Sequence, residues 1–258
     1  MTHSMKGKKA LIVGVANERS IAWGIAQALH REGAELAFTF LGDALEKRVR
    51  PLAESIGSTI CLPCDVRNEE QVQEVFKTLD IKWGKLDSLV HSIAYAERTE
   101  LEGNFSATSR NGFVTALEIS AYSLISLTRE AMPLMQKAGE GTIIAMTYYG
   151  SEKVVPNYNV MGVAKAALEC SMKYLAAELG PQNIRVNAIS AGPVRTLAAA
   201  GIRGFKGMLQ MVESRAPLRR NVTLEEVAES GLFLLSPNSR GITGETLYID
   251  SGYNILGM

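Results

Sequence analysis

Tyr158 and Lys165 stand seven residues apart in the stretch Tyr-Asn-Val-Met-Gly-Val-Ala-Lys. Seven residues make nearly two helical turns, so both side chains would share one helix face, about 10 Å apart along the axis. A phenol can hydrogen-bond to a developing oxyanion, and an ammonium can hold sugar hydroxyls and keep the local field positive. The pair suits a cofactor-dependent reductase. The same spacing also occurs on many solvated helix faces, so the surrounding elements must show whether this pair belongs to an active site.

Short apolar runs alternate with longer amphipathic runs along the whole chain. The apolar runs predict buried strands at residues 10–15, 35–41, 59–66, 88–94, 141–148, 184–190 and 246–249. The amphipathic runs predict helices at residues 20–31, 43–55, 69–82, 112–137, 158–179 and 224–235. This alternation predicts an α/β fold, a Rossmann-type doubly wound parallel sheet of about seven strands with helices on both faces. Because no linker or repeat interrupts it, we expect a single dinucleotide-binding catalytic domain over residues 1–258.

Composition excludes several classes of function. Basic and acidic residues balance at 27 each, so no net charge favours nucleic acid or an anionic membrane as a partner. The apolar run at residues 10–13 is too short for a signal peptide, and no segment approaches the ~20 apolar residues of a membrane span. We therefore expect a cytoplasmic protein. Cys61 and Cys64 form a C-x-x-C, but no second pair follows and the histidines are scattered, so we expect buried thiols and no metal site.

The turn after the first predicted strand is a candidate phosphate site. Gly14 begins this turn, where backbone N–H groups and a helix dipole can hold a pyrophosphate. The turn is longer than the usual G-x-G-x-x-G and keeps only Gly14 and Gly24, so on its own it indicates a nucleotide weakly. Ser20 can cap the helix that follows and donate to phosphate.

The ends of the second and third strands bear on the choice of cofactor. Leu41 stands where an acidic residue usually reads the adenosine ribose, and Asp43 follows where it can also cap the next helix. No Arg or Lys at residues 40–43 would hold a 2′-phosphate, so the sequence favours NADH over NADPH. Asp65 and Val66 are placed to bind adenine, and the alternative for Asp65 is a turn residue.

Together these motifs resemble the short-chain dehydrogenase/reductase superfamily and, within it, the bacterial enoyl-acyl-carrier-protein reductases, over essentially the whole chain. The resemblance rests on Gly14…Ser20-Ile21-Ala-Trp-Gly24, His91-Ser-Ile93-Ala94, Tyr148…Tyr158…Lys165 and Arg185…Gly192-Pro193-Val194-Arg195-Thr196. Ordinary ketoreductases instead carry Tyr-x3-Lys with a serine upstream. Anchored on Lys165, those two positions hold Met161 and Tyr148.

The resemblance implies a reaction: NADH-dependent reduction of the carbon–carbon double bond of trans-2-enoyl thioesters on acyl carrier protein, the last reductive step of type II fatty-acid elongation. Hydride would reach the β-carbon, and Tyr158 would stabilise the enolate as a neutral donor. Lys165 would hold the nicotinamide ribose. Tyr148 would line the acyl pocket and assist the proton step, with plain packing as the alternative.

The resemblance also implies the binding residues. The expected cofactor contacts are Gly14, Ser20, Ile21, Leu41, Asp65, Val66, Ile93, Lys165, Gly192, Pro193, Val194, Thr196 and Ala198. Substrate would contact Ala96, Tyr148 and Tyr158. Residues 195–220 would form a mobile substrate lid or a plain helical hairpin, with Arg203 and Lys206 offered to the acidic carrier protein, and the chain would form a homotetramer.

Two other functions stay open. A carbonyl reductase or alcohol dehydrogenase would keep the superfamily, although this chain lacks the Tyr-x3-Lys and serine of those enzymes. A non-catalytic dinucleotide sensor is the second alternative. Such sensors commonly lose the tyrosine or the lysine, whereas this chain keeps both.

Overall fold

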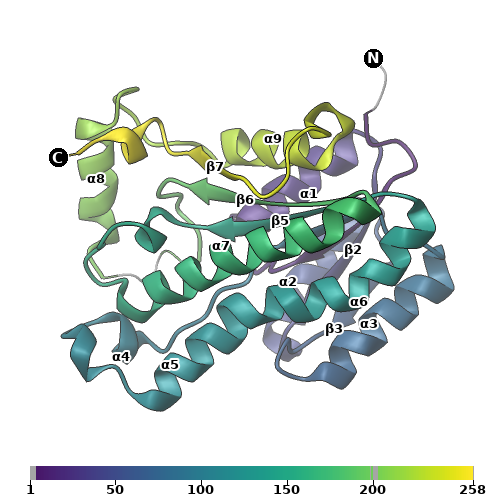
Figure 1. Cartoon of the computed structure of the whole chain (residues 1–258), viewed down its shortest axis with the longest axis horizontal. Helices are drawn as coiled ribbons and strands as arrows, with labels where there is room; N and C mark the ends of the chain where they lie inside the picture. Colours follow the sequence, from purple (N-terminus) through teal and green to yellow (C-terminus); the bar gives the residue numbers. More distant parts are fainter. Residues whose placement is uncertain (1–3, 198, 200–202, 258) are drawn as a thin grey trace.

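The computed structural model describes residues 4–197, 199 and 203–257 (Figure 1). Within them a seven-stranded parallel sheet runs in the order β3-β2-β1-β4-β5-β6-β7. Its strands are β1 (Lys9–Val13), β2 (Glu35–Phe40), β3 (Ile60–Pro63), β4 (Ser88–His91), β5 (Gly141–Thr147), β6 (Ile184–Ala191) and β7 (Thr246–Ile249). The predicted Rossmann-type parallel sheet is confirmed, and the strand ends differ from the predicted ones by a few residues.

Helices cover both faces of the sheet (Figure 1). One face carries α1 (Ile21–Arg31), α2 (Gly42–Ser55) and α9 (Leu224–Leu235). The other carries α3 (Glu69–Trp83), α6 (Ser123–Ala138) and α7 (Asn159–Leu179). The remaining helices are α4 (Arg98–Leu101), α5 (Arg110–Leu117) and α8 (Phe205–Arg215), with short 3-10 turns at Phe105–Ala107, Tyr149–Ser151, Gly180–Gln182, Pro237–Ser239 and Tyr253–Ile255. None of the described helices is long and apolar enough to cross a membrane.

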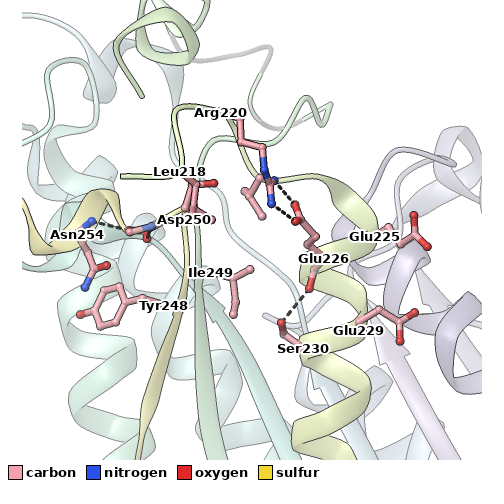
Figure 2. Close-up of a pocket in the computed structure, with 13 residues that line it drawn as sticks. Leu218, Arg220, Glu225, Glu226, Glu229, Ser230, Tyr248, Ile249, Asp250 and Asn254 are labelled. Atoms are coloured by element: carbon pink, nitrogen blue, oxygen red, sulfur yellow. Dashed lines mark hydrogen bonds and ion pairs between the residues drawn. The ribbon is translucent and has the colours of Figure 1, made fainter. Parts of the chain in front are cut away.

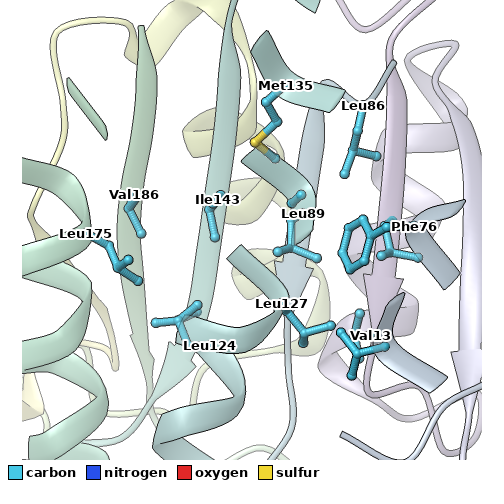
Figure 3. Packing of buried hydrophobic residues seen from close by; sticks show 14 of the residues in the cluster. Val13, Phe76, Leu86, Leu89, Leu124, Leu127, Met135, Ile143, Leu175 and Val186 are labelled. Carbon is cyan, nitrogen blue, oxygen red and sulfur yellow. The ribbon is translucent and has the colours of Figure 1, made fainter. Parts of the chain in front are cut away.

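The core is divided by the sheet into two apolar layers. Successive side chains of a strand point to opposite faces, so Leu11 and Val13 enter one layer while Ala10 and Ile12 enter the other. Figure 3 shows the first layer, where strand residues such as Val13 and Ile143 meet residues of the covering helices. Both faces are buried, which is why the strands read as continuous apolar runs.

Two helical predictions needed correction. The helix predicted at residues 112–137 is divided into α5, a π-helical turn at Glu118–Tyr122, and α6. The π turn contains Ser120, whose hydroxyl accepts from Tyr95 N at 2.9 Å and donates to Tyr95 O at 3.1 Å. A π-helical turn holds one residue more than an α-helical turn, and the residue Ser120 of this turn is the one that contacts the loop at Tyr95. In addition, part of the segment at residues 195–220, expected as a mobile lid or a plain helical hairpin, forms the helix α8.

Candidate active site

The carboxyl ends of the parallel strands meet at one edge of the sheet. From β1 the chain runs outward through β2 to β3 and then returns to β4, on the other side of β1. In open α/β sheets, ligands bind outside the carboxyl ends at such a switch point. The predicted cofactor residues that the structure describes in the turns after β1, β2, β3, β4 and β6 follow the ends of those strands by at most eight residues. The structure therefore brings them to one edge.

Gly14 marks the place where the first turn meets the loop after β4. Its φ is +111°, and a Cβ built on it would lie 2.1 Å from Ser92 O. Ser92 N in turn donates to Val13 O at 2.9 Å. Because only glycine fits this contact, the turn presents bare backbone at the switch point, which suits a pyrophosphate.

Ser20 takes the N-cap position of α1, but its side chain makes no cap hydrogen bond. The expectation that Ser20 caps the helix was wrong. Its Oγ instead accepts from Ala16 N at 3.0 Å and Asn17 N at 3.1 Å, because the hydroxyl faces back into the turn. Ser20 therefore fixes the shape of the candidate phosphate turn, and Ile21 begins the helix behind it.

The two candidate adenosine positions differ in their surroundings. Leu41 is 54% exposed at the start of α2. The Asp65 carboxylate pairs with the Arg67 guanidinium, with Oδ2 2.8 Å from Nη2 and Oδ1 3.2 Å from Nε. These hydrogen bonds lower the pKa of Asp65. Its contacts match the turn alternative, while adenine binding by Asp65 and the buried Val66 stays a prediction.

Tyr158 and Tyr148 lie edge to face, with ring centroids 5.1 Å apart. Tyr158 immediately precedes α7 and is only 8% exposed. Burial, followed by the neighbouring Tyr148 and Glu169, raises its pKa far above the usual value of a tyrosine. The Tyr148 hydroxyl contacts Met208 Sδ at 3.1 Å, and burial raises its pKa to about 12. Both phenols are therefore neutral at physiological pH.

Lys165 is buried in α7, seven residues after Tyr158, and its Nζ donates to Met146 O at 2.7 Å. Burial lowers its pKa to about 8, while the charge of Glu169 opposes this effect. Glu169 accepts from Thr147 Oγ1 at 2.5 Å. The ammonium thus sits close to its titration point, with an acidic group one helical turn away.

The loop after β4 is held against the same cluster. Ala96 packs against the apolar group that contains Tyr158 and Tyr148, so the three predicted substrate residues do lie together. Ile93 packs on the core layer of α3, α6 and α7. Behind the loop, His91 is fully buried, and burial followed by the positive charge of Lys165 lowers its pKa to about 3. His91 is therefore neutral.

The loop after β6 carries the other predicted cofactor residues. Gly192 N donates to Ile249 O at 2.8 Å, and Pro193 is buried beside it. Thr196 N donates to Val194 O at 2.8 Å, and Thr196 Oγ1 accepts from Ala199 N at 3.1 Å. The predicted contact at residue 198 and the lid residues 200–202 lie outside the described residues.

A hollow of about 610 Å³ lies beside this edge, between α9 and β7 (Figure 2). Glu225, Glu226 and Glu229 line it from α9, together with Asp250 after β7. Arg220 also lines the hollow, and its guanidinium is paired with the Glu226 carboxylate at 2.8 Å, as Figure 2 shows. An excess of carboxylates repels a diphosphate, so the hollow is a poor cofactor site. In the described part of the chain, no three metal-ligating side chains converge.

Some residues of the site were missed by sequence reasoning. Glu169 stands four residues after Lys165, and this spacing alone would have placed the two on one helix face. Ser120 and its contact with Tyr95 had no local signal, because the partners are 25 residues apart. The same holds for Asn157 and Asn159 on either side of Tyr158, which bond to segments distant in sequence.

Comparison with known proteins matches residues 14–254 to the model of the enoyl-(acyl carrier protein) reductase family. A relative from Nostoc sp. (strain PCC 7120 / SAG 25.82 / UTEX 2576), enoyl-[acyl-carrier-protein] reductase [NADH], is 54% identical over 99% of each chain. The crystal structure of the Bacillus cereus enoyl-acyl carrier protein reductase with NADP+ and indole naphthyridinone is 51% identical, covers 99% of both chains and has a TM-score of 0.96. The Anaplasma phagocytophilum reductase in complex with NAD is 52% identical, covers 98% and 96% of the two chains and has a TM-score of 0.94.

Proposed function

The chain belongs to the enoyl-(acyl carrier protein) reductase family, and we infer that it reduces the double bond of trans-2-enoyl thioesters borne on acyl carrier protein, with NADH as the cofactor. This makes it an oxidoreductase of fatty-acid synthesis and bears out the resemblance drawn from its motifs. The observation that carries the mechanism is the buried, neutral Tyr158 packed against Tyr148 and placed before the helix that holds Lys165.

Tyr158 is proposed as the donor to the substrate oxygen. Bound NADH supplies a hydride, and addition at the β-carbon of the enoyl thioester moves negative charge onto the thioester oxygen as an enolate. A neutral donor aimed at that oxygen stabilises the transition state, and its effect is larger in a site that excludes water. Burial keeps the Tyr158 proton in place, because it raises the pKa of the phenol. Tyr148 lines the acyl pocket and assists the later proton step.

Lys165 is proposed to hold the nicotinamide ribose hydroxyls. Its ammonium has three N–H donors, and Met146 O occupies one of them, which leaves two for hydroxyl oxygens. With a pKa of about 8, it is mostly charged at neutral pH. Its charge also favours the developing enolate through space.

The remaining cofactor contacts are proposed along the edge of the sheet. The Gly14–Ser20 turn fits the pyrophosphate, since it leads from the end of β1 into the N-terminus of α1, where backbone N–H groups and the helix dipole favour an anion. Leu41 offers no charge to a 2′-phosphate, in keeping with NADH. The loop after β4 at Ile93 and the loop at residues 192–196 complete the site.

The partner, the lid and the assembly are proposed on further observations. The exposed Lys206 lies at the start of α8, where it suits an acidic carrier protein, and Arg203 just before the helix would join it by exchanging its pair with Glu102 for the carrier. Met208 touches the Tyr148 hydroxyl, so α8 is placed to act as a lid over the acyl chain.

Tyr174 on α7 and Ile255 near the C-terminus are 76% and 73% exposed, as expected of surfaces covered in a homotetramer. A cytoplasmic location goes with this pathway.

The direct test is turnover of a crotonyl thioester with NADH, followed by the fall of nicotinamide absorbance. We expect steady reduction, and no turnover with either NADH or NADPH would refute the function. A panel of ketones under the same conditions tests the carbonyl-reductase alternative. Because Met161 stands where a ketoreductase has its tyrosine, we expect no ketone to compete with the enoyl thioester.

A further inference from the structure

The candidate catalytic tyrosine is flanked by two asparagines with left-handed backbone. Asn157 has a φ of 60° and Asn159 a φ of 31°, whereas Tyr158 between them has a φ of −116°. A positive φ is uncommon in residues other than glycine, and asparagine is among those that tolerate it best. The sign of φ therefore changes from positive to negative and back to positive over these three residues. This backbone path sets the direction of the Tyr158 side chain.

Each asparagine side chain also reaches a segment distant in the sequence. Asn157 Nδ2 donates to Arg203 O at 3.0 Å, just before α8. Asn159 Nδ2 donates to Gly103 O at 3.2 Å, just after α4. The two receiving segments are joined to each other, because Arg203 Nη1 lies 3.4 Å from Glu102 Oε2. These contacts close a ring of polar links around Tyr158.

Both receiving segments also contact the cluster around the two tyrosines. Leu101 of α4 packs against the apolar group that contains Tyr158. Met208 of α8 accepts the hydrogen bond from the Tyr148 hydroxyl. The segments at residues 98–104 and 203–215 therefore border the space in which the thioester would lie.

We propose that Asn157 and Asn159 are positioning residues, which lock Tyr158 to the two segments that border the substrate. This inference rests on the proposed function, because the lock matters only if the Tyr158 hydroxyl must meet a substrate oxygen. The asparagines do not touch the reacting atoms. They fix the distance and angle of the donor, on which the rate of the reaction depends.

The test replaces each asparagine by glycine. Glycine accepts a positive φ without strain, so Asn157→Gly and Asn159→Gly keep the backbone path and remove only the amide link. Asn183→Gly is the matched control. Asn183 has a φ of 59° and donates through Nδ2 to Gly139 O at 3.2 Å, but it lies beyond the other end of α7, roughly 30 Å away at the 1.5 Å rise per residue of a helix. Glu102→Gln weakens the third link, and because the half-buried Glu102 also pairs with Arg98 of α4 at 3.3 Å, the informative readout for this variant is residues 205–215.

Three experiments are made on the full chain: steady-state kinetics with crotonyl thioester for kcat and KM, titration for the Kd of NADH, and backbone amide hydrogen exchange at residues 98–104 and 205–215. We expect each glycine variant at the site to lower kcat about fivefold, the effect of one neutral hydrogen bond, with Kd for NADH unchanged. Asn157→Gly should speed exchange at residues 205–215, Asn159→Gly at residues 98–104, and Glu102→Gln at residues 205–215. Asn183→Gly should give wild-type values in all three experiments.

The outcomes separate this inference from the proposed function. If the wild-type protein does not reduce the thioester, the proposed function fails, and hydrogen exchange alone decides whether the lock exists. If the wild-type protein is active, wild-type kcat in both Asn157→Gly and Asn159→Gly overturns the lock. Unchanged exchange in both segments overturns it whatever the rates, and so does an equal loss of kcat in Asn183→Gly.

Discussion

The buried Lys165 ammonium predicts that the cofactor-free protein becomes more stable as the pH rises above neutrality. Its pKa falls from 10.5 in the unfolded chain to about 8 in the folded protein, mainly through burial. Below the folded pKa both states carry the proton, and the full cost of burying the charge is present. Between the two pKa values the unfolded state binds more protons, so the free energy of unfolding increases with pH and the cost is relieved.

The size of the effect follows from the two pKa values. The whole difference corresponds to about 3 kcal/mol, at about 1.4 kcal/mol for each tenfold change in proton affinity. From about pH 7 to about pH 9, the part relieved is about 1 kcal/mol. For a chain of this length, that amounts to a rise of about 2–4 °C in the melting temperature.

Thermal unfolding of the wild type and of Lys165→Met, without cofactor and across this pH range, isolates the effect. All other titrating groups are common to both proteins, and the lost hydrogen bond to Met146 O costs the variant the same at every pH. Between pH ~7 and ~9, the free energy of unfolding of the wild type should therefore rise by about 1 kcal/mol relative to that of the variant. A difference that stays flat, or that changes in the opposite direction, would refute the reasoning that burial depresses this pKa. NADH affinity should fall over the same range, because the neutral amine holds ribose hydroxyls less well.

Further predictions concern single residues. Tyr158→Phe should lower kcat by about 100-fold to 1000-fold through loss of the oxyanion donor, with Kd for NADH unchanged, and a wild-type rate would rule out the donor role. Gly14→Ala should abolish NADH binding and lower the melting temperature, because its Cβ would stand 2.1 Å from Ser92 O; calorimetric titration that finds wild-type affinity would contradict this. A thiol reagent should modify Cys61 and Cys64 only slowly in the native protein, since burial raises the pKa of both thiols to about 11, and fast modification of either would contradict their burial. Leu41→Arg should shift the ratio of kcat/KM values toward NADPH, and an unchanged ratio would show that this residue does not face the adenosine ribose.

Local pattern was enough to predict the sheet and most of the helices. The strands are buried on both faces, and this leaves apolar runs that need no knowledge of their partners. The π-helical turn at Glu118–Tyr122 could not be predicted, because the side chain of Ser120 bonds to Tyr95 in another loop. The helix α8 was obscured by Gly204 and Gly207, although Gly204, with a φ of +82°, lies just before the helix rather than inside it.

The candidate site was predictable where its chemistry is local. The spacing of Tyr158 and Lys165 identifies them as candidates, and the position of Gly14 directly after a predicted strand does the same for that residue. Ser20 was placed correctly but given the wrong bond, since sequence cannot tell whether a serine hydroxyl faces the helix or the preceding turn. The pKa of Lys165 is set by its burial, with the charge of Glu169 opposing the effect, and this burial needs the folded chain.

The exposure of Leu41 has a consequence for how chains of this kind diverge. The residue stands on the rim of the fold, with 54% of its surface in solvent, whereas Tyr158 and Lys165 are enclosed by neighbours. A change at Leu41 disturbs little packing, while a change at either of the other two disturbs both stability and chemistry. If Leu41 faces the adenosine ribose, as proposed, a single substitution there could change the preference between dinucleotides without disturbing the buried residues proposed for the reaction.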